Sequence, residues 1–185
     1  MTKTNQLTTC AMLIALSTVL MLLSNLIPSM PWGGSVTLCS MVPLILIPLM
    51  IDTKWGIFSG VVYALIQMMT GFYPPPTQTV VDFVLVVLLD YVLAFGVLGC
   101  AGIFYCALGK KRWAIPLSGA IVTSLRYLCH ILSGILIWGV YAEEGQTVLA
   151  YSLVYNGSYM IPEIILTTIT LVFLPAYLIR VLCVR

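Results

Sequence analysis

The stretch from Ala114 to Val140 has the sequence AIPLSGAIVTSLRYLCHILSGILIWGV, an apolar run with Arg126 and His130 near its middle. A charge at the centre of a membrane costs roughly 2.5–3.5 kcal/mol or more, so an intramembrane cation usually marks a functional site. Arg126 and His130 are four residues apart and share one helix face, and Trp138 lies two turns further on, displaced by about 80°. The run therefore predicts a helix that presents a cation, an imidazole and an indole to one cavity.

The composition of the chain places that helix in a membrane protein. Of the 185 residues, 61% are hydrophobic and 8% are charged, and the mean hydropathy is +1.10. A soluble domain carries about 25% charged residues. We therefore predict an all-α integral membrane protein with a single domain over residues 1–185, surrounded by membrane lipid and without a nucleic-acid partner.

Uninterrupted apolar runs predict six transmembrane helices, because about 20 apolar residues are needed to cross a bilayer. The expected spans are about 9–28, 36–51, 55–72, 79–108, 114–140 and 147–180. The second and third are close to the lower limit of length. The first run lacks an Ala-x-Ala cleavage site and exceeds the apolar core of a signal peptide, so we expect it to be retained.

Basic residues orient the predicted bundle. Seven of the eight Lys and Arg lie at the two chain ends and in the loops after the second and fourth spans: Lys3, Lys54, Lys110, Lys111, Arg112, Arg180 and Arg185. The positive-inside rule therefore predicts that both termini are cytoplasmic. The loops on the outer side carry no Lys or Arg, and we expect Glu143 and Glu144 in the last of them to be solvated.

Three acidic residues fall inside the predicted spans. At about 1.5 Å of rise per residue, Asp90, Arg126 and Glu163 lie at a similar depth, so they can meet. One interpretation is a structural ion pair of Arg126 with Glu163 or Asp90, and the other is a ligand site. Asp82 lies nearer the outer surface and is a weaker candidate.

The last span adds polar and aromatic groups. Asn156 and Glu163 share a helix face, whereas Tyr151 and Asn156 are offset by about 140°, so both reach one ligand only if the helix starts irregularly. Tyr155 and Tyr159 are typical of the aromatic belt at a membrane interface. Together these groups favour a small, flat, cationic ligand that lies against Trp138.

Several other chemistries lack their residues. Gly102 and Gly109-Lys110 do not have the spacing of a phosphate loop, and Lys111 stands where Ser or Thr is required, so we do not expect the chain to hydrolyse ATP. The six cysteines are scattered without Cys-x-x-Cys spacing, which predicts neither a disulfide nor a metal site. Glycines recur every third residue at Gly96, Gly99 and Gly102 and predict a surface for close helix packing.

The order of several motifs resembles one family over essentially the whole chain. These motifs are Gly33-Gly34-Ser35-Val36-Thr37 through Met41-Val42-Pro43, Lys54-Trp55-Gly56, Leu89-Asp90-Tyr91-Val92-Leu93-Ala94-Phe95-Gly96, Arg126-Tyr127-Leu128-Cys129-His130 with Trp138, and Tyr151-Ser152-Leu153-Val154-Tyr155-Asn156-Gly157-Ser158-Tyr159. They are similar to the ThiT (YuaJ) family, the thiamine-specific substrate-binding S components of energy-coupling-factor (ECF) vitamin transporters. The resemblance implies six helices and a thiamine site near the outer surface, in the plasma membrane of a bacterium.

The resemblance also implies roles for individual residues. Asp90 stands where the family places a carboxylate against the aminopyrimidine, and Tyr151 and Asn156 match its other pyrimidine contacts. His130 and Trp138 match the residues that flank the thiazolium, and Arg126 matches a basic position beside the ligand.

This chain departs from some relatives at four positions. It has Asp90, Arg126, Gly34 and Tyr63 where they carry Glu, Lys, Trp and Trp. We expect Trp32 or Tyr73 to supply the missing aromatic wall.

Ala11 and Ala15 resemble the family's Ala-x-x-x-Ala surface for docking a transmembrane coupling subunit, which works with two separate ATPase subunits. We therefore predict a thiamine-binding S component that catalyses no reaction and needs no cofactor of its own. One alternative is an S component for another vitamin or for a precursor such as hydroxymethylpyrimidine. A distant alternative is an intramembrane enzyme that uses His130 with Asp90 or Glu163.

Overall fold

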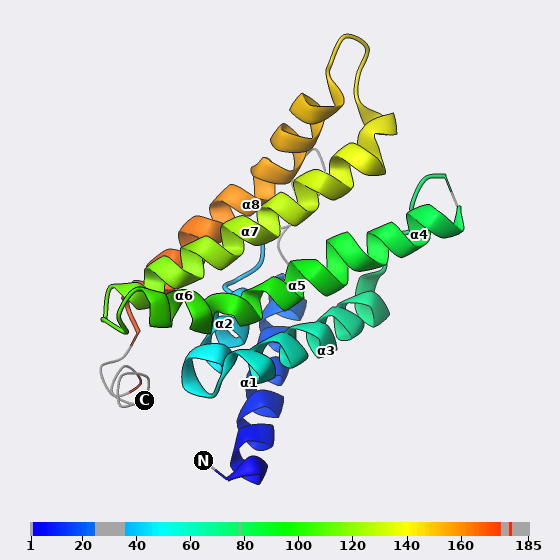
Figure 1. Cartoon of the computed structure of the whole chain (residues 1–185). Helices are drawn as coiled ribbons and strands as arrows, with labels where there is room; N and C mark the ends of the chain where they lie inside the picture. Colours follow the sequence, from blue (N-terminus) through cyan, green and yellow to red (C-terminus); the bar gives the residue numbers. More distant parts are fainter. Residues whose placement is uncertain (1, 25–35, 78, 175–177, 179–185) are drawn as a thin grey trace.

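The computed structural model describes residues 2–24, 36–77, 79–174 and 178, and the regular elements in these ranges are all helical (Figure 1). They are α1 (Lys3–Ser24), α2 (Met41–Met50), α3 (Thr53–Gly71), α4 (Val80–Val86), the π-helical η1 (Val87–Leu93), α5 (Ala94–Gly96), the 3-10 helix η2 (Val97–Cys100), α6 (Ala101–Ala107), α7 (Ala114–Leu136), the 3-10 helix η3 (Trp138–Tyr141) and α8 (Val148–Val172). The all-α prediction is confirmed.

The described parts of five predicted spans each correspond to one helix or to one continuous helical stretch. The fifth span is divided, because α7 ends at Leu136 and Trp138 begins the separate η3, so the prediction of one helix carrying Arg126, His130 and Trp138 is wrong for Trp138. The fourth is the run α4 to α6, which continues from Val80 to Ala107. Within the described ranges, three stretches are long and apolar enough to cross a membrane by length and composition alone: Lys3–Ser24, Val80–Ala107 and Ala114–Leu136. The helices α3 and α8 carry more polar side chains, among them Gln67, Asn156 and Glu163.

The helix α2 is the core of the molecule rather than a lipid-facing span. Its ten residues rise about 15 Å, half the thickness of the hydrocarbon layer. Nine of the ten are buried, and Ile45 and Ile47 are completely inaccessible. The apolar run 36–51 is therefore hydrophobic because protein surrounds it, a cause that composition alone does not distinguish from lipid contact.

Two helix pairs frame the rest of the fold. In Figure 1, α7 and α8 lie side by side as an antiparallel hairpin, and their contact is the most extensive in the described chain.

The long helix α4 to α6 packs on α3, with Gly99 against the backbone of Gly56 and Ile57. A Cβ on Gly102 would lie 2.8 Å from the Pro48 oxygen, so the predicted close packing is confirmed at Gly99 and Gly102. At Gly96 the backbone also lies close to α3, since a Cβ on Gly60 would be 3.1 Å from the Gly96 Cα, but a Cβ on Gly96 itself would meet nothing within 4 Å.

Gly99→Ala is expected to destabilise the protein by about 1–3 kcal/mol, because the added Cβ overlaps backbone atoms of α3 that cannot rotate away. Gly96→Ala on the same helical run is the matched control, since nothing lies within 4 Å of its Cβ position. Thermal unfolding of the purified variants in detergent measures the difference. Equal midpoints for the two variants would contradict the close α3 contact.

Candidate functional site

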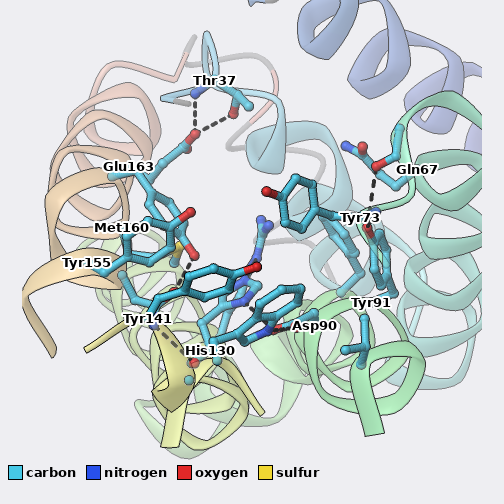
Figure 2. Close-up of a pocket in the computed structure, with 18 of the residues that line it drawn as sticks. Thr37, Gln67, Tyr73, Asp90, Tyr91, His130, Tyr141, Tyr155, Met160 and Glu163 are labelled. Carbon is cyan, nitrogen blue, oxygen red and sulfur yellow. Dashed lines mark hydrogen bonds and ion pairs between the residues drawn. The ribbon is translucent and has the colours of Figure 1, made fainter. Parts of the chain in front are cut away.

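A cavity of about 890 Å³ lies among α3, η1, α7, η3 and α8 (Figure 2). This volume is at the upper end of the range for small-molecule sites. Most residues predicted for the site line this cavity: Tyr73, Asp90, Arg126, His130, Trp138, Tyr151, Asn156 and Glu163. Tyr63 is completely buried behind the wall and accepts a hydrogen bond from the lining residue Gln67 at 2.9 Å. Trp32 lies outside the described residues.

Asp90 projects from an irregular part of the long helix. It lies within the π-helical segment Val87–Leu93, and both Asp90 and the following residue Tyr91 line the cavity. A π-helical turn is wider than an α-helical turn and is frequent at functional sites. Local sequence gave no signal for this irregularity, because Val, Leu and Tyr are ordinary helix residues.

The carboxylate of Asp90 is surrounded by three side chains of the α7–η3 segment. His130 Nδ1 lies 3.0 Å from Oδ1, and Oδ2 accepts hydrogen bonds from Ser133 Oγ at 2.6 Å and Trp138 Nε1 at 3.1 Å. Among the described residues, neither Asp90 nor Glu163 lies within 4.0 Å of Arg126 in an ion pair; Asp90 faces His130 instead. The expected structural ion pair of Arg126 is therefore wrong, because its long side chain points along α7 to His130.

Arg126 fixes the protonation pattern of His130. Its Nε donates a hydrogen bond to His130 Nε2 at 3.3 Å, so Nε2 is the acceptor and the ring proton is on Nδ1, where it faces Asp90. The guanidinium of Arg126 also lies 4.1 Å from the centre of the Phe95 ring, a cation–π contact. A positive charge inside the membrane is thus held by a ring face and a neutral imidazole.

The side-chain amide of Asn156 forms hydrogen bonds that join α8 to α7. Its Nδ2 donates to the His130 carbonyl oxygen at 3.2 Å and to the Ser152 carbonyl oxygen at 3.0 Å, while Oδ1 accepts from the Tyr159 hydroxyl at 2.6 Å. The start of α8 is regular, because Thr147 caps it by accepting a hydrogen bond from the Ala150 amide. Tyr151 and Asn156 nevertheless line one cavity, because the cavity extends along much of α8.

Aromatic rings cover two walls of the cavity. Trp138 lies between Tyr73, at 5.5 Å between ring centres, and Tyr141, stacked at 6.3 Å. Tyr73 therefore lies where the sequence analysis expects an aromatic wall. On α8, Tyr155 packs against Tyr159, and both line the cavity. Beyond the aromatic-belt position predicted for them, these two tyrosines therefore form part of the cavity wall.

Glu163 ties α8 to the segment before α2. One carboxylate oxygen accepts from both the backbone amide and the hydroxyl of Thr37, as the dashed lines in Figure 2 show. The residue is 1% exposed, and its other oxygen, Oε2, has no hydrogen-bond partner among the described residues. Glu163 thus combines a structural contact with a buried carboxylate oxygen that lacks a hydrogen-bond partner among the described residues.

Comparison with known proteins assigns the chain to a family. The model of the thiamine transporter protein family (Thia_YuaJ) matches residues 7–182. The thiamine transporter ThiT of Bacillus subtilis is 33% identical over 176 residues, covering 89% of this chain and 86% of that protein. ThiT of Lacticaseibacillus paracasei is 30% identical over 91 residues, covering 44% of this chain and 45% of that protein. The chain belongs to the Thia_YuaJ family.

The solved structure of ThiT from Listeria monocytogenes matches the fold of this Thia_YuaJ chain. The TM-score is 0.75 at 21% sequence identity, over 97% of this chain and 99% of that chain. The family resemblance predicted from the sequence is therefore confirmed. The protein is a membrane transport protein and not an enzyme, which rules out the intramembrane acid–base enzyme built on His130.

The sequence analysis of this Thia_YuaJ protein missed several polar residues in or near the cavity, among them Thr37, Gln67, Tyr91 and Ser133. Gln67 was detectable in principle, because an amide in an apolar helix needs a partner. Ser133 and Thr37 gave no signal, since small hydroxyl residues are common throughout the apolar runs.

Asn156→Ala is expected to lower the stability of the ligand-free protein by about 1–3 kcal/mol, because the buried His130 carbonyl loses its side-chain donor. Tyr151→Phe is the control on the same helix, since none of the hydrogen bonds described involves the Tyr151 hydroxyl and its ring stacking on Tyr155 is retained. Thermal unfolding without added ligand measures both. If Asn156→Ala unfolds like the wild type, the amide does not hold α7 to α8.

Proposed function

We propose that this chain binds thiamine in the 890 Å³ cavity and is the S component of an ECF-type vitamin transporter in the bacterial plasma membrane. The observation that supports this most is the position of Asp90, which is hydrogen-bonded to both His130 and Trp138 in the wall of that cavity. A carboxylate beside an indole suits a ligand that combines an amine donor with a cationic ring. The chain needs no cofactor of its own in this role.

The two thiamine rings fit two parts of the cavity. The aminopyrimidine donates to Asp90, and Tyr151 and Asn156 lie on the same wall. The thiazolium lies against Trp138 and its neighbours Tyr73 and Tyr141, where ring faces attract a cation.

The neutral state of His130 favours a cationic ligand. Arg126 donates to Nε2, and a second proton on the imidazole would break that contact and add a charge beside the thiazolium. The Phe95 face balances part of the Arg126 charge. We therefore assign Arg126 mainly to the support of His130.

A precursor such as hydroxymethylpyrimidine, or another vitamin, is the second candidate ligand. A pyrimidine alone uses Asp90 but leaves the Tyr73–Trp138–Tyr141 group without a cation. The presence of both features favours thiamine.

Transport in this proposal requires partner subunits. The sequence lacks a phosphate loop, so ATP hydrolysis belongs to a separate ATPase pair, joined through a transmembrane coupling subunit. Ala11 and Ala15 are exposed on α1, four residues apart, and small residues at this spacing allow a partner helix to approach closely.

Thiamine is expected to quench the intrinsic tryptophan fluorescence of the purified protein, because its thiazolium stacks on Trp138. Mass spectrometry of the co-purifying ligand identifies it independently. Trp138→Ala is expected to weaken binding by about 1–2 kcal/mol or more through loss of the cation–π contact, measured by calorimetry. A wild-type protein that binds hydroxymethylpyrimidine more tightly than thiamine would favour the second candidate.

Replacement of Ala11 and Ala15 by Leu is expected to abolish thiamine uptake in cells, because the larger side chains keep the coupling subunit away. Both residues lie on α1, away from the cavity lining, so equilibrium binding to the purified double variant should be preserved. Met12→Leu, at an exposed position on the same helix, is the control. Full uptake by the double variant would contradict the docking assignment, and joint loss of uptake and binding would indicate a packing role.

A further inference from the structure

Ser133 lies at the centre of the Asp90 hydrogen bonds without reaching the cavity. It is completely buried on α7 and is not among the residues that line the cavity. Its hydroxyl donates to Asp90 Oδ2 at 2.6 Å and accepts from Trp138 Nε1 at 3.2 Å. The same indole N–H also donates to Oδ2 at 3.1 Å. Ser133 therefore contacts both residues assigned to the ligand.

These bonds determine which part of the carboxylate is open. An ionised carboxylate has about four acceptor positions, two on each oxygen. On Asp90, Ser133 and Trp138 occupy both positions of Oδ2, and His130 occupies one position of Oδ1. One acceptor position on Oδ1 remains. A ligand must donate a hydrogen there, so an amine fits and a carbonyl oxygen does not.

We propose that Ser133 is a positioning residue that directs this single acceptor of Asp90 and thereby sets the preference for an amino over an oxo substituent on the ligand. The inference rests on the proposed function, since it assumes that an aminopyrimidine faces Asp90. Without the Ser133 hydroxyl, Oδ2 keeps only the indole N–H, and the carboxylate can rotate about its bond to Cβ. The indole also loses one of its two acceptors, so its ring plane is less well fixed.

Selectivity separates this role from simple packing. A packing defect at Ser133 would weaken every ligand to a similar degree. A misdirected carboxylate weakens the amino ligand selectively, because the 4-amino group donates to Oδ1 whereas a 4-oxo group at the same position is an acceptor. Thiamine and its 4-oxo analogue, in which a carbonyl replaces the pyrimidine amine, therefore form the matched pair of probes.

The experiment compares Ser133→Ala and Ser133→Cys with wild type. Cysteine has nearly the same shape as serine but is a weaker donor, so it should give an intermediate effect. Ser118→Ala is the control, because Ser118 is also completely buried on α7 but bonds only to the carbonyl of Ile115 in its own helix. Affinities for both probes are measured by calorimetry in detergent, and Trp138 emission is recorded without ligand.

The wild type should bind thiamine more tightly than the 4-oxo analogue. In Ser133→Ala the ratio of the two affinities should fall by about tenfold or more, with a shift in tryptophan emission, because a hydrogen bond to a charged group is lost. Ser118→Ala should leave the ratio unchanged. An unchanged ratio in a folded Ser133→Ala, or in Ser133→Cys if the alanine variant does not fold, would overturn the positioning role. A wild type that binds neither probe would instead overturn the proposed function, and the inference with it.

Discussion

The carboxylate of Asp90 is the group on which the rest of the site depends. A charged group inside a membrane is tolerated when it is paired or hydrogen-bonded. Asp90 meets that requirement through His130, Ser133 and Trp138, which come from a single stretch of α7 and η3. These hydrogen bonds join the long helix to the α7–α8 hairpin. The ligand contact that we propose for Asp90 uses the part of the carboxylate that this arrangement leaves open.

The irregular parts of the fold serve this pairing. The π-helical turn at Val87–Leu93 brings Asp90 and Tyr91 together to one cavity, and the 3-10 helix η3 begins with Trp138 directly above α7. Close packing of Gly99 on α3 holds the other side of the long helix. The long helix is therefore positioned by small residues on one side and by hydrogen bonds on the other. Both kinds of contact suit a membrane protein, because helices surrounded by lipid are not driven together by the hydrophobic effect.

The sequence predicted the helical runs well, since apolar length and charge placement depend on the bilayer and not on tertiary detail. It also grouped Asp90, Arg126, His130 and Glu163 correctly at one cavity, because rise along a helix gives depth. The sequence analysis failed where the depth of a residue along its helix does not determine which side chain it contacts. Arg126 faces Phe95 and His130 rather than an acid, and Tyr155 and Tyr159 face inward. Which side chains meet, where a π-helical turn forms and what Ser133 contacts depend on how each helix is rotated about its own axis and on side-chain geometry. Residue spacing alone determines neither of these.

The placement of charges explains how one cation, Arg126, and two acids, Asp90 and Glu163, share so small a volume. Within the cavity wall, Asp90 faces a neutral imidazole, Arg126 faces an aromatic ring, and Glu163 is bonded to the uncharged Thr37. None of the described acids is neutralised by direct contact with Arg126. A full internal ion pair would leave no net field for a ligand, whereas separated charges held by neutral groups keep the negative field of Asp90 available. Because Arg126 donates to His130 and lies against the Phe95 ring, its charge does not directly neutralise that of Asp90.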